Sequence, residues 1–144
     1  KTSVILRLSI LENGVKDSYR ESFKSLDSRF KYVYSPIANV SNARNIGIKV
    51  SSGEYVAFID IDDKMDSNYL ELLYKKAKDG NCDVVLCNYR IERKSKVKEI
   101  ISDLSGKDYI GAYLIKNTFM PNFYNFKDTG YVWRELISLS TIKK

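Results

Sequence analysis

Apolar runs of strand length alternate with amphipathic segments of helix length along most of the chain. Runs rich in β-branched and aromatic residues predict strands, and apolar residues that recur every three or four positions predict helices. The run 55–59 is almost continuously hydrophobic, which indicates a parallel strand covered on both faces. The predicted strands are 3–11, 30–34, 55–59 and 82–88, and the predicted helices are 17–26, 41–50 and 68–80. Such alternation predicts one domain, residues 1–144, with a layered α/β/α fold and a mostly parallel sheet.

Turn and capping residues mark the ends of these elements. Glu12-Asn13-Gly14 ends the first strand, and Ser41 is a suitable cap for the helix that follows Pro36. After residue 88 the pattern is weaker. It predicts a strand at 97–101, a helix at 107–116, a loop at 117–131 and a helix within 132–144.

The composition is that of a globular protein, with 44% hydrophobic and 29% charged residues among 144. Cys82 and Cys87 lie five residues apart in one predicted strand, so they face opposite sides and are expected to be two buried thiols. No apolar run reaches the roughly 18 residues of a membrane span, and the first residues lack a signal-peptide core. A cytoplasmic protein is therefore expected.

The formal net charge of +6 could favour anionic ligands, nucleic acid or an acidic membrane surface. The lysines are scattered, and no basic stripe interleaved with aromatic residues is present, so nucleic acid is not an expected partner. One local cluster of cations comprises Arg90, Arg93, Lys94, Lys96 and Lys98. The chain has no histidine, so a metal ion would need oxygen or cysteine ligands.

Asp60, Asp62 and Asp63 stand between a predicted buried strand and a predicted helix. Ligands of open α/β sheets bind outside the carboxyl ends of the strands. Mg²⁺ takes one or two carboxylates and completes its shell with substrate phosphates. These residues therefore suit a metal-bound diphosphate. The alternative is that they only stabilise the N-terminus of the following helix.

The stretch NVSNARNIGIKVSSGEYVAFIDIDD, residues 39–63, resembles the inverting, family 2 type of glycosyltransferase with the GT-A fold. The next stretch, LELLYKKAKDGNCDVVLCNYRI, also resembles that family's following helix and strand. The matched positions are Val40, Ser41, Ala43, Arg44, Asn45, Gly47, Gly53, Glu54, Tyr55, Asp60, Asp62 and Asp63.

This resemblance implies roles for individual residues. Asp60 corresponds to the aspartate on the ribose side of the nucleotide, and Asp62 to the ligand of the metal that bridges the diphosphate, Mn²⁺ or Mg²⁺. Asp63 corresponds to its neighbour in the donor-sugar pocket, and Arg44 to a nucleotide-side arginine. A structural ion pair is the alternative for Arg44. Gly47 is expected to let its helix approach the sheet closely.

The chain departs from the family at both ends. The helix between the family's first two strands has no counterpart in the sequence, and Glu12-Asn13-Gly14 stands in place of Asp-Asp-Gly, so a rearranged or truncated chain is expected. Residues 131–136, YVWREL, resemble the segment before the family's catalytic carboxylate. No catalytic base is assigned. Glu135 is expected to be an exposed helix residue, although it and Asp128 are the first candidates.

Two functions follow as expectations. The first is transfer of sugar from a nucleotide-diphosphate donor, a UDP-sugar, to a glycan or lipid-linked acceptor with inversion. The second is a degenerate nucleotide-sugar-binding module without efficient transfer. Both are expected in the cytoplasm, with peripheral association at the inner face of the membrane left open.

Overall fold

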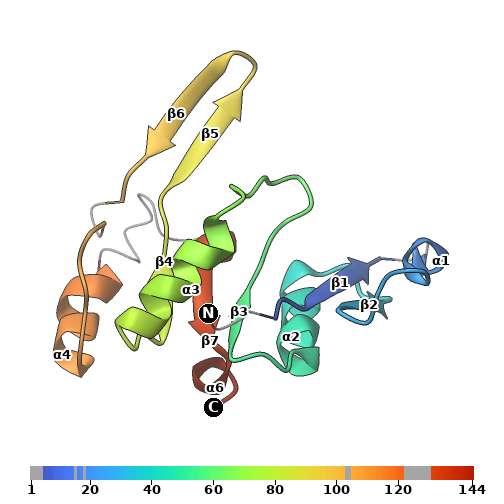
Figure 1. Ribbon diagram of the computed structural model, residues 1–144, viewed down its shortest axis with the longest axis horizontal. Coiled ribbons are helices and arrows are strands. Elements are labelled where there is room, and N and C mark those ends of the chain that lie inside the picture. Colours follow the sequence, from blue (N-terminus) through green and yellow to red (C-terminus); the bar gives the residue numbers. More distant parts are fainter. Residues whose placement is uncertain (1–4, 15, 18, 103–104, 122–130) are drawn as a thin grey trace. The chain divides into compact units, whose positions relative to one another are not determined.

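The computed structural model describes residues 5–14, 16–17, 19–102, 105–121 and 131–144 (Figure 1). The chain forms two compact units. The first comprises Lys1–Val56 with Ser138–Lys144, and the second comprises Ala57–Ile137. The single domain predicted for residues 1–144 stays a prediction. Within the described residues, no helix has both the length and the apolar character needed to cross a bilayer.

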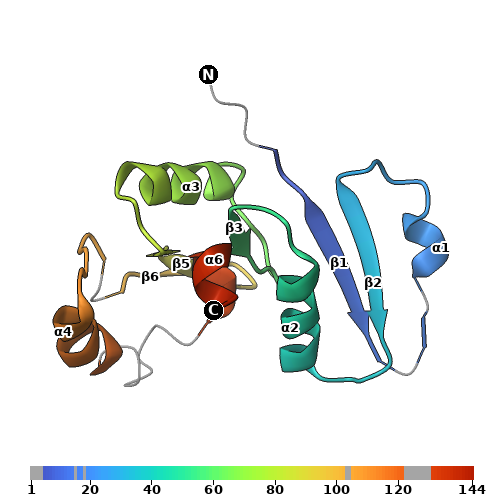
Figure 2. The same ribbon diagram turned by 90° about the horizontal axis from the view of Figure 1, so that it is seen from below.

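The first unit is built on two parallel strands, as the alternating pattern predicts. Strand β1, Leu8–Asn13, pairs in register with β2, Phe30–Ser35 (Figure 2). Between them the chain forms only one helical turn, α1, Arg20–Phe23, although a helix over 17–26 was predicted. Asp17 does not cap a helix, because its carboxylate accepts hydrogen bonds from Arg20 and from the Tyr32 hydroxyl, both at 2.6 Å.

Helix α2, Val40–Val50, covers β1 in the first unit (Figure 2). The cap is Asn39 rather than the predicted Ser41, since the Asn39 side chain accepts a hydrogen bond from the backbone N–H of Asn42 at 2.9 Å. Gly47 is buried, and a Cβ atom there would lie 3.2 Å from Leu11 Cδ1. The predicted close approach of this helix to the sheet is therefore confirmed.

In the second unit, helix α3, Tyr69–Asp79, packs on strand β4, Val84–Leu86. Strand β4 pairs antiparallel with β7, Glu135–Ser138, so that Val85 lies opposite Leu136. The buried hydrophobic side chains described in this unit come from these three elements: Leu73, Ala77, Val85 and Leu136. Strand β3, Tyr55–Ala57, completes the order β3-β7-β4. Parallel pairing is thus seen in β1–β2, whereas β4–β7 is antiparallel.

The helix predicted within 132–144 is wrong for its middle part. The chain forms a 3₁₀ turn at Val132–Arg134, then β7, and only then the short helix α6, Leu139–Ile142. Pairing with β4 buries Leu136 and overrides the local pattern. Cys82 and Cys87 form no disulfide, which confirms two thiols, but both are half-buried rather than buried.

Strands β5, Tyr89–Arg93, and β6, Lys96–Ile100, form an antiparallel hairpin that extends from the end of β4 (Figure 1). The sequence predicted β6 but missed β5. The predicted helix at 107–116 begins later, as α4, Ala112–Leu114, and continues as a π-helix, Ile115–Phe119, into the predicted loop. The rest of that loop, 122–130, lies outside the described residues.

We expect Gly47→Val to destabilise the first unit by about 1–3 kcal/mol, because the new side chain enters the space occupied by Leu11. Urea unfolding measures the free energy of unfolding. Leu11→Ala in the same chain should recover part of the loss, which a double-mutant cycle detects. Additive losses from the two substitutions would contradict a contact between α2 and β1 at this point.

Candidate functional site

The three predicted aspartates share one turn after β3. The Asp63 N–H donates a hydrogen bond to the Asp60 carbonyl at 3.0 Å, which closes a β-turn over residues 60–63. Strand β3 ends at Ala57, two residues before its predicted end. Asp60 is half-buried, and Asp62 and Asp63 are exposed. The structure therefore brings these three carboxylates onto one short acidic turn.

Negative charge is concentrated on the acidic turn. The pKa of Asp63 is raised, chiefly by partial burial of its carboxyl and further by the negative charges of Asp62 and Asp60. Like charges that share a site disfavour ionisation of one another. A cation at the turn would relieve this repulsion.

The donor atoms of the acidic turn suit a hard divalent ion. They are all carboxylate oxygens, and the exposure of Asp62 leaves room for further ligands. Among the residues that the structure describes, no three or more Cys, Asp or Glu side chains are grouped closely enough to hold a metal ion by themselves.

The alternative role of the aspartates, stabilising the start of α3, gains little from the structure. The N-cap of α3 is Asn68, which makes no side-chain capping bond, and Asp63 precedes the first helical residue by six positions. The effect of a charge on a helix terminus falls off within about one turn. The acidic turn is therefore not explained by helix capping.

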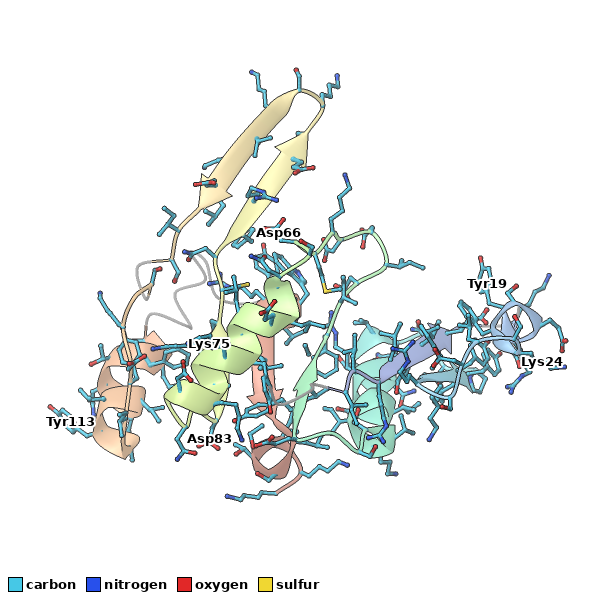
Figure 3. All side chains as sticks on the ribbon, viewed as in Figure 1. Tyr19, Lys24, Asp66, Lys75, Asp83 and Tyr113 are labelled. Carbon is cyan, nitrogen blue, oxygen red and sulfur yellow. The ribbon has the colours of Figure 1, made fainter. Side chains whose placement is uncertain are left out.

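Two ion pairs join the segment after the acidic turn to strand β5. Arg90 Nη2 lies 2.7 Å from Asp66 Oδ1, and Lys64 Nζ lies 3.6 Å from Glu92 Oε2. Asp66 lies near the start of α3, at the foot of the hairpin (Figure 3). The residues on either side of Met65, between the turn and α3, are thus each paired with a residue of β5.

Arg44 belongs to the other unit. It lies in α2 and is half-buried. The three aspartates thus share one turn of the second unit, whereas Arg44 lies in the first unit. Ser41 and Asn45 are exposed on the same helix.

The carboxylate of Glu12 is engaged within the first unit. Glu12, at the end of β1, accepts a hydrogen bond from the Tyr19 N–H at 3.1 Å and lies within hydrogen-bond reach of the Tyr32 hydroxyl. The same hydroxyl is 2.6 Å from Asp17 Oδ1. Two carboxylates, those of Glu12 and Asp17, thus meet at the Tyr32 hydroxyl.

The structure corrects the prediction for Glu135. It begins β7, is only 7% exposed, and is not an exposed helix residue. Its neighbour Arg134 is 1% exposed, with its guanidinium carbon 5.4 Å from the centre of the Tyr89 ring. Trp133 meets that ring edge-on at 5.1 Å. The aromatic residues at alternate positions, Tyr131 and Trp133, are the feature of the sequence from which a partly buried, extended segment could have been predicted.

Glu135 belongs to a buried polar cluster with Tyr69, Cys87 and Arg134. Burial raises the pKa of Glu135, and the positive charge of Arg134 opposes that rise. Burial also raises the pKa values of Tyr69 and Cys87. The Tyr69 hydroxyl donates a hydrogen bond to the Trp133 carbonyl at 2.9 Å. The other candidate base, Asp128, lies outside the described residues.

Comparison with known proteins supports the resemblance seen in the sequence. Residues 5–135 match the family described as Glycosyl transferase family 2. A Bacillus subtilis (strain 168) protein named "Putative glycosyltransferase EpsH" is 30% identical over 143 residues, or 96% of this chain. The Staphylococcus aureus (strain N315) protein named poly(ribitol-phosphate) beta-N-acetylglucosaminyltransferase TarP is 36% identical over 85 residues, or 59% of this chain. A cholesterol galactosyltransferase of Borreliella burgdorferi is 26% identical over 149 residues, or 94% of this chain.

The chain spans only part of these relatives. The matched residues cover 40% of EpsH, 26% of TarP and 40% of the cholesterol galactosyltransferase. The match includes the acidic turn, α2 and α3.

We expect Glu135→Gln to stabilise the chain at neutral pH by a few degrees, since about 1 kcal/mol corresponds to roughly 4 °C in a domain of this size. The raised pKa means that the folded chain binds the Glu135 proton more tightly than the unfolded chain does. Its contribution to stability is present below the ordinary pKa of 4.5 and is lost as the pH rises through the raised pKa. Melting temperatures of both chains between pH 4 and 8 measure this. A gain independent of pH would contradict the assignment.

Proposed function

Because this chain belongs to glycosyl transferase family 2, we propose that it supplies the donor-binding part of an enzyme that transfers a sugar from a nucleotide-diphosphate donor. The donor is a UDP-sugar, and the acceptor is a glycan or a lipid-linked molecule, with inversion at the transferred carbon. The acidic turn supports this proposal, since it groups three carboxylates of the kind that hold a metal-bound diphosphate. The protein would work in the cytoplasm, at a membrane when its acceptor is lipid-linked.

The names of the relatives bear on the sugar that is transferred and leave the acceptor open. One name describes transfer of N-acetylglucosamine to poly(ribitol-phosphate), and the other describes a galactosyltransferase acting on cholesterol. The two sugars are hexose derivatives, whereas the two acceptors share little chemistry. Transfer of a hexose-type sugar is therefore the better-supported part of the proposal.

Each residue of the acidic turn would have its own task. Asp62 would hold Mn²⁺ or Mg²⁺, and Asp60 would accept a hydrogen bond from a ribose hydroxyl. Asp63, with its raised pKa, would face the hydroxyls of the donor sugar. When bound, the metal supplies positive charge that stabilises the leaving diphosphate. Arg44 would donate paired hydrogen bonds to phosphate oxygens, for which the guanidinium fork is well suited.

One observation favours the second candidate, a nucleotide-sugar-binding module without efficient transfer. A catalytic base must come within hydrogen-bond reach of the acceptor hydroxyl. Glu135 is buried, and its raised pKa disfavours the ionised form that a base needs. Release of UDP from several UDP-sugars, measured with Mn²⁺ and a panel of glycan acceptors, separates the two candidates. Rapid release that depends on an acceptor supports the transferase, and UDP binding without such release supports the module.

We expect Asp62→Asn to remove the effect of Mn²⁺ on UDP binding. For the unaltered chain, Mn²⁺ should tighten binding by about tenfold or more, which is about 1.4 kcal/mol. Calorimetric titration with Mn²⁺ or with EDTA measures this. Asp83→Asn is the matched control, because it removes the same charge from an exposed position beyond the other end of α3 (Figure 3). Equal UDP affinity with Mn²⁺ and with EDTA would refute the metal role.

We expect Arg44→Ala to weaken UDP binding by about tenfold or more, since hydrogen bonds to charged groups contribute about 1.5–3 kcal/mol. The melting temperature should change by less than about 3 °C, equivalent to roughly 1 kcal/mol. Lys49→Ala, which removes an exposed cation from the same helix, controls for net charge. A large loss of stability with unchanged UDP affinity would instead show a structural ion pair.

A further inference from the structure

The β5–β6 hairpin has two faces of different charge. Residues directly opposite one another in an antiparallel pair point to the same side, and successive pairs alternate sides. The pairs Tyr89–Ile100, Ile91–Lys98 and Arg93–Lys96 therefore share one face. The pairs Arg90–Glu99 and Glu92–Val97 share the other face.

We call the first of these the basic face, defined by Ile91, Arg93, Lys96 and Lys98. It carries three cations and no acidic residue. No ion pair of these cations is seen among the residues that the structure describes, and all three are exposed. Lys94, in the turn that joins the strands, adds a further exposed cation.

The other face carries charges of both signs. Arg90 pairs with Asp66 at 2.7 Å, and Glu92 pairs with Lys64 at 3.6 Å. Glu99 lies directly opposite Arg90 on the paired strand. The uncompensated positive charge of the hairpin is therefore confined to the basic face and the turn.

Exposed apolar side chains accompany the cations. Ile91, on the basic face, is 38% exposed, and Val97, between Lys96 and Lys98 but on the other face, is 62% exposed. A surface that combines lysine and arginine with exposed aliphatic groups suits the headgroup region of an anionic bilayer, where charges meet phosphates and apolar groups enter the acyl boundary.

Nucleic acid is a poorer match for the same surface. Binding of single strands depends on aromatic side chains that stack with bases. Tyr89 is the aromatic residue of the hairpin, and its ring packs edge-on against Trp133 at 5.1 Å and Tyr131 at 5.8 Å. That ring is already engaged within the second unit.

We propose that the basic face docks this chain reversibly on an anionic phospholipid surface. The residues of the basic face take no part in the proposed donor site, so the inference goes beyond the proposed function and does not rest on it. Each cation near an anionic membrane strengthens binding by roughly fivefold, so three cations contribute about a hundredfold. Such binding is weak for each chain and decreases with salt.

Flotation with vesicles tests this proposal. The chain is mixed with phosphatidylcholine vesicles that contain or lack phosphatidylglycerol, and its bound fraction is measured at low and high salt. The test variant is Arg93→Gln/Lys96→Gln/Lys98→Gln. The matched control, Lys31→Gln/Lys49→Gln/Lys116→Gln, removes the same charge from exposed positions on other elements.

The unaltered chain and the control should float with the anionic vesicles at low salt and should not float with phosphatidylcholine alone. The test variant should bind the anionic vesicles about a hundredfold more weakly, with unchanged melting temperature and UDP affinity. If the triple variant does not fold, the single charge reversal Lys96→Glu and the salt dependence of the unaltered chain carry the test.

Three results would overturn the proposal. The unaltered chain could fail to bind anionic vesicles, or the test variant could bind them as well as the control does. The hairpin cations could also be required for binding a fluorescent single-stranded RNA but not for binding vesicles. Because UDP binding is measured separately, failure of the proposed donor site would be seen independently.

Discussion

The antiparallel pairing of β7 with β4 is the interaction on which the second unit depends. It joins positions about fifty residues apart, so its formation must offset the entropy of closing a long loop. Burial of Leu136 against the strand and helix that carry Val85 and Leu73 supplies the compensating hydrophobic free energy. The same pairing draws Arg134 and Glu135 out of solvent and places them beside Tyr69 and Cys87. The polar cluster around Glu135 is thus a consequence of the pairing between β4 and β7.

Local signals in the sequence predicted the elements that depend on local physics. The helical spacing around Ala43 and Gly47 identified α2, and the carboxylates at residues 60–63 identified the acidic turn. The family motif added roles that no pattern of hydrophobicity could supply. Helix caps were less predictable, since Asn39 and Ser41 are both good capping residues, and only the backbone conformation selects between them.

Nonlocal pairing explains most of the errors. Nothing within residues 132–138 specifies a strand, because the partner β4 lies far away in the sequence. Strand β5 was missed for a related reason: apart from Tyr89, its side chains are exposed, so no buried face imposes a clear alternation on it. The burial of Glu135 was missed because residues 132–138 were predicted to be helical. A carboxyl on an exposed helix gives no reason to expect a raised pKa.

The two ion pairs that fasten residues 64 and 66 to β5 make the acidic segment sensitive to ionic strength. Pairs with this much solvent exposure contribute at most about 1 kcal/mol each, and added salt weakens them. The backbone that follows Asp62 and Asp63 is therefore held to the hairpin by two weak ion pairs. A higher salt concentration weakens these ion pairs and gives the segment more conformational freedom. Ordering the segment around a ligand then costs more conformational entropy. Weaker ligand binding at high salt would then reflect a loosened protein segment as well as screened charges.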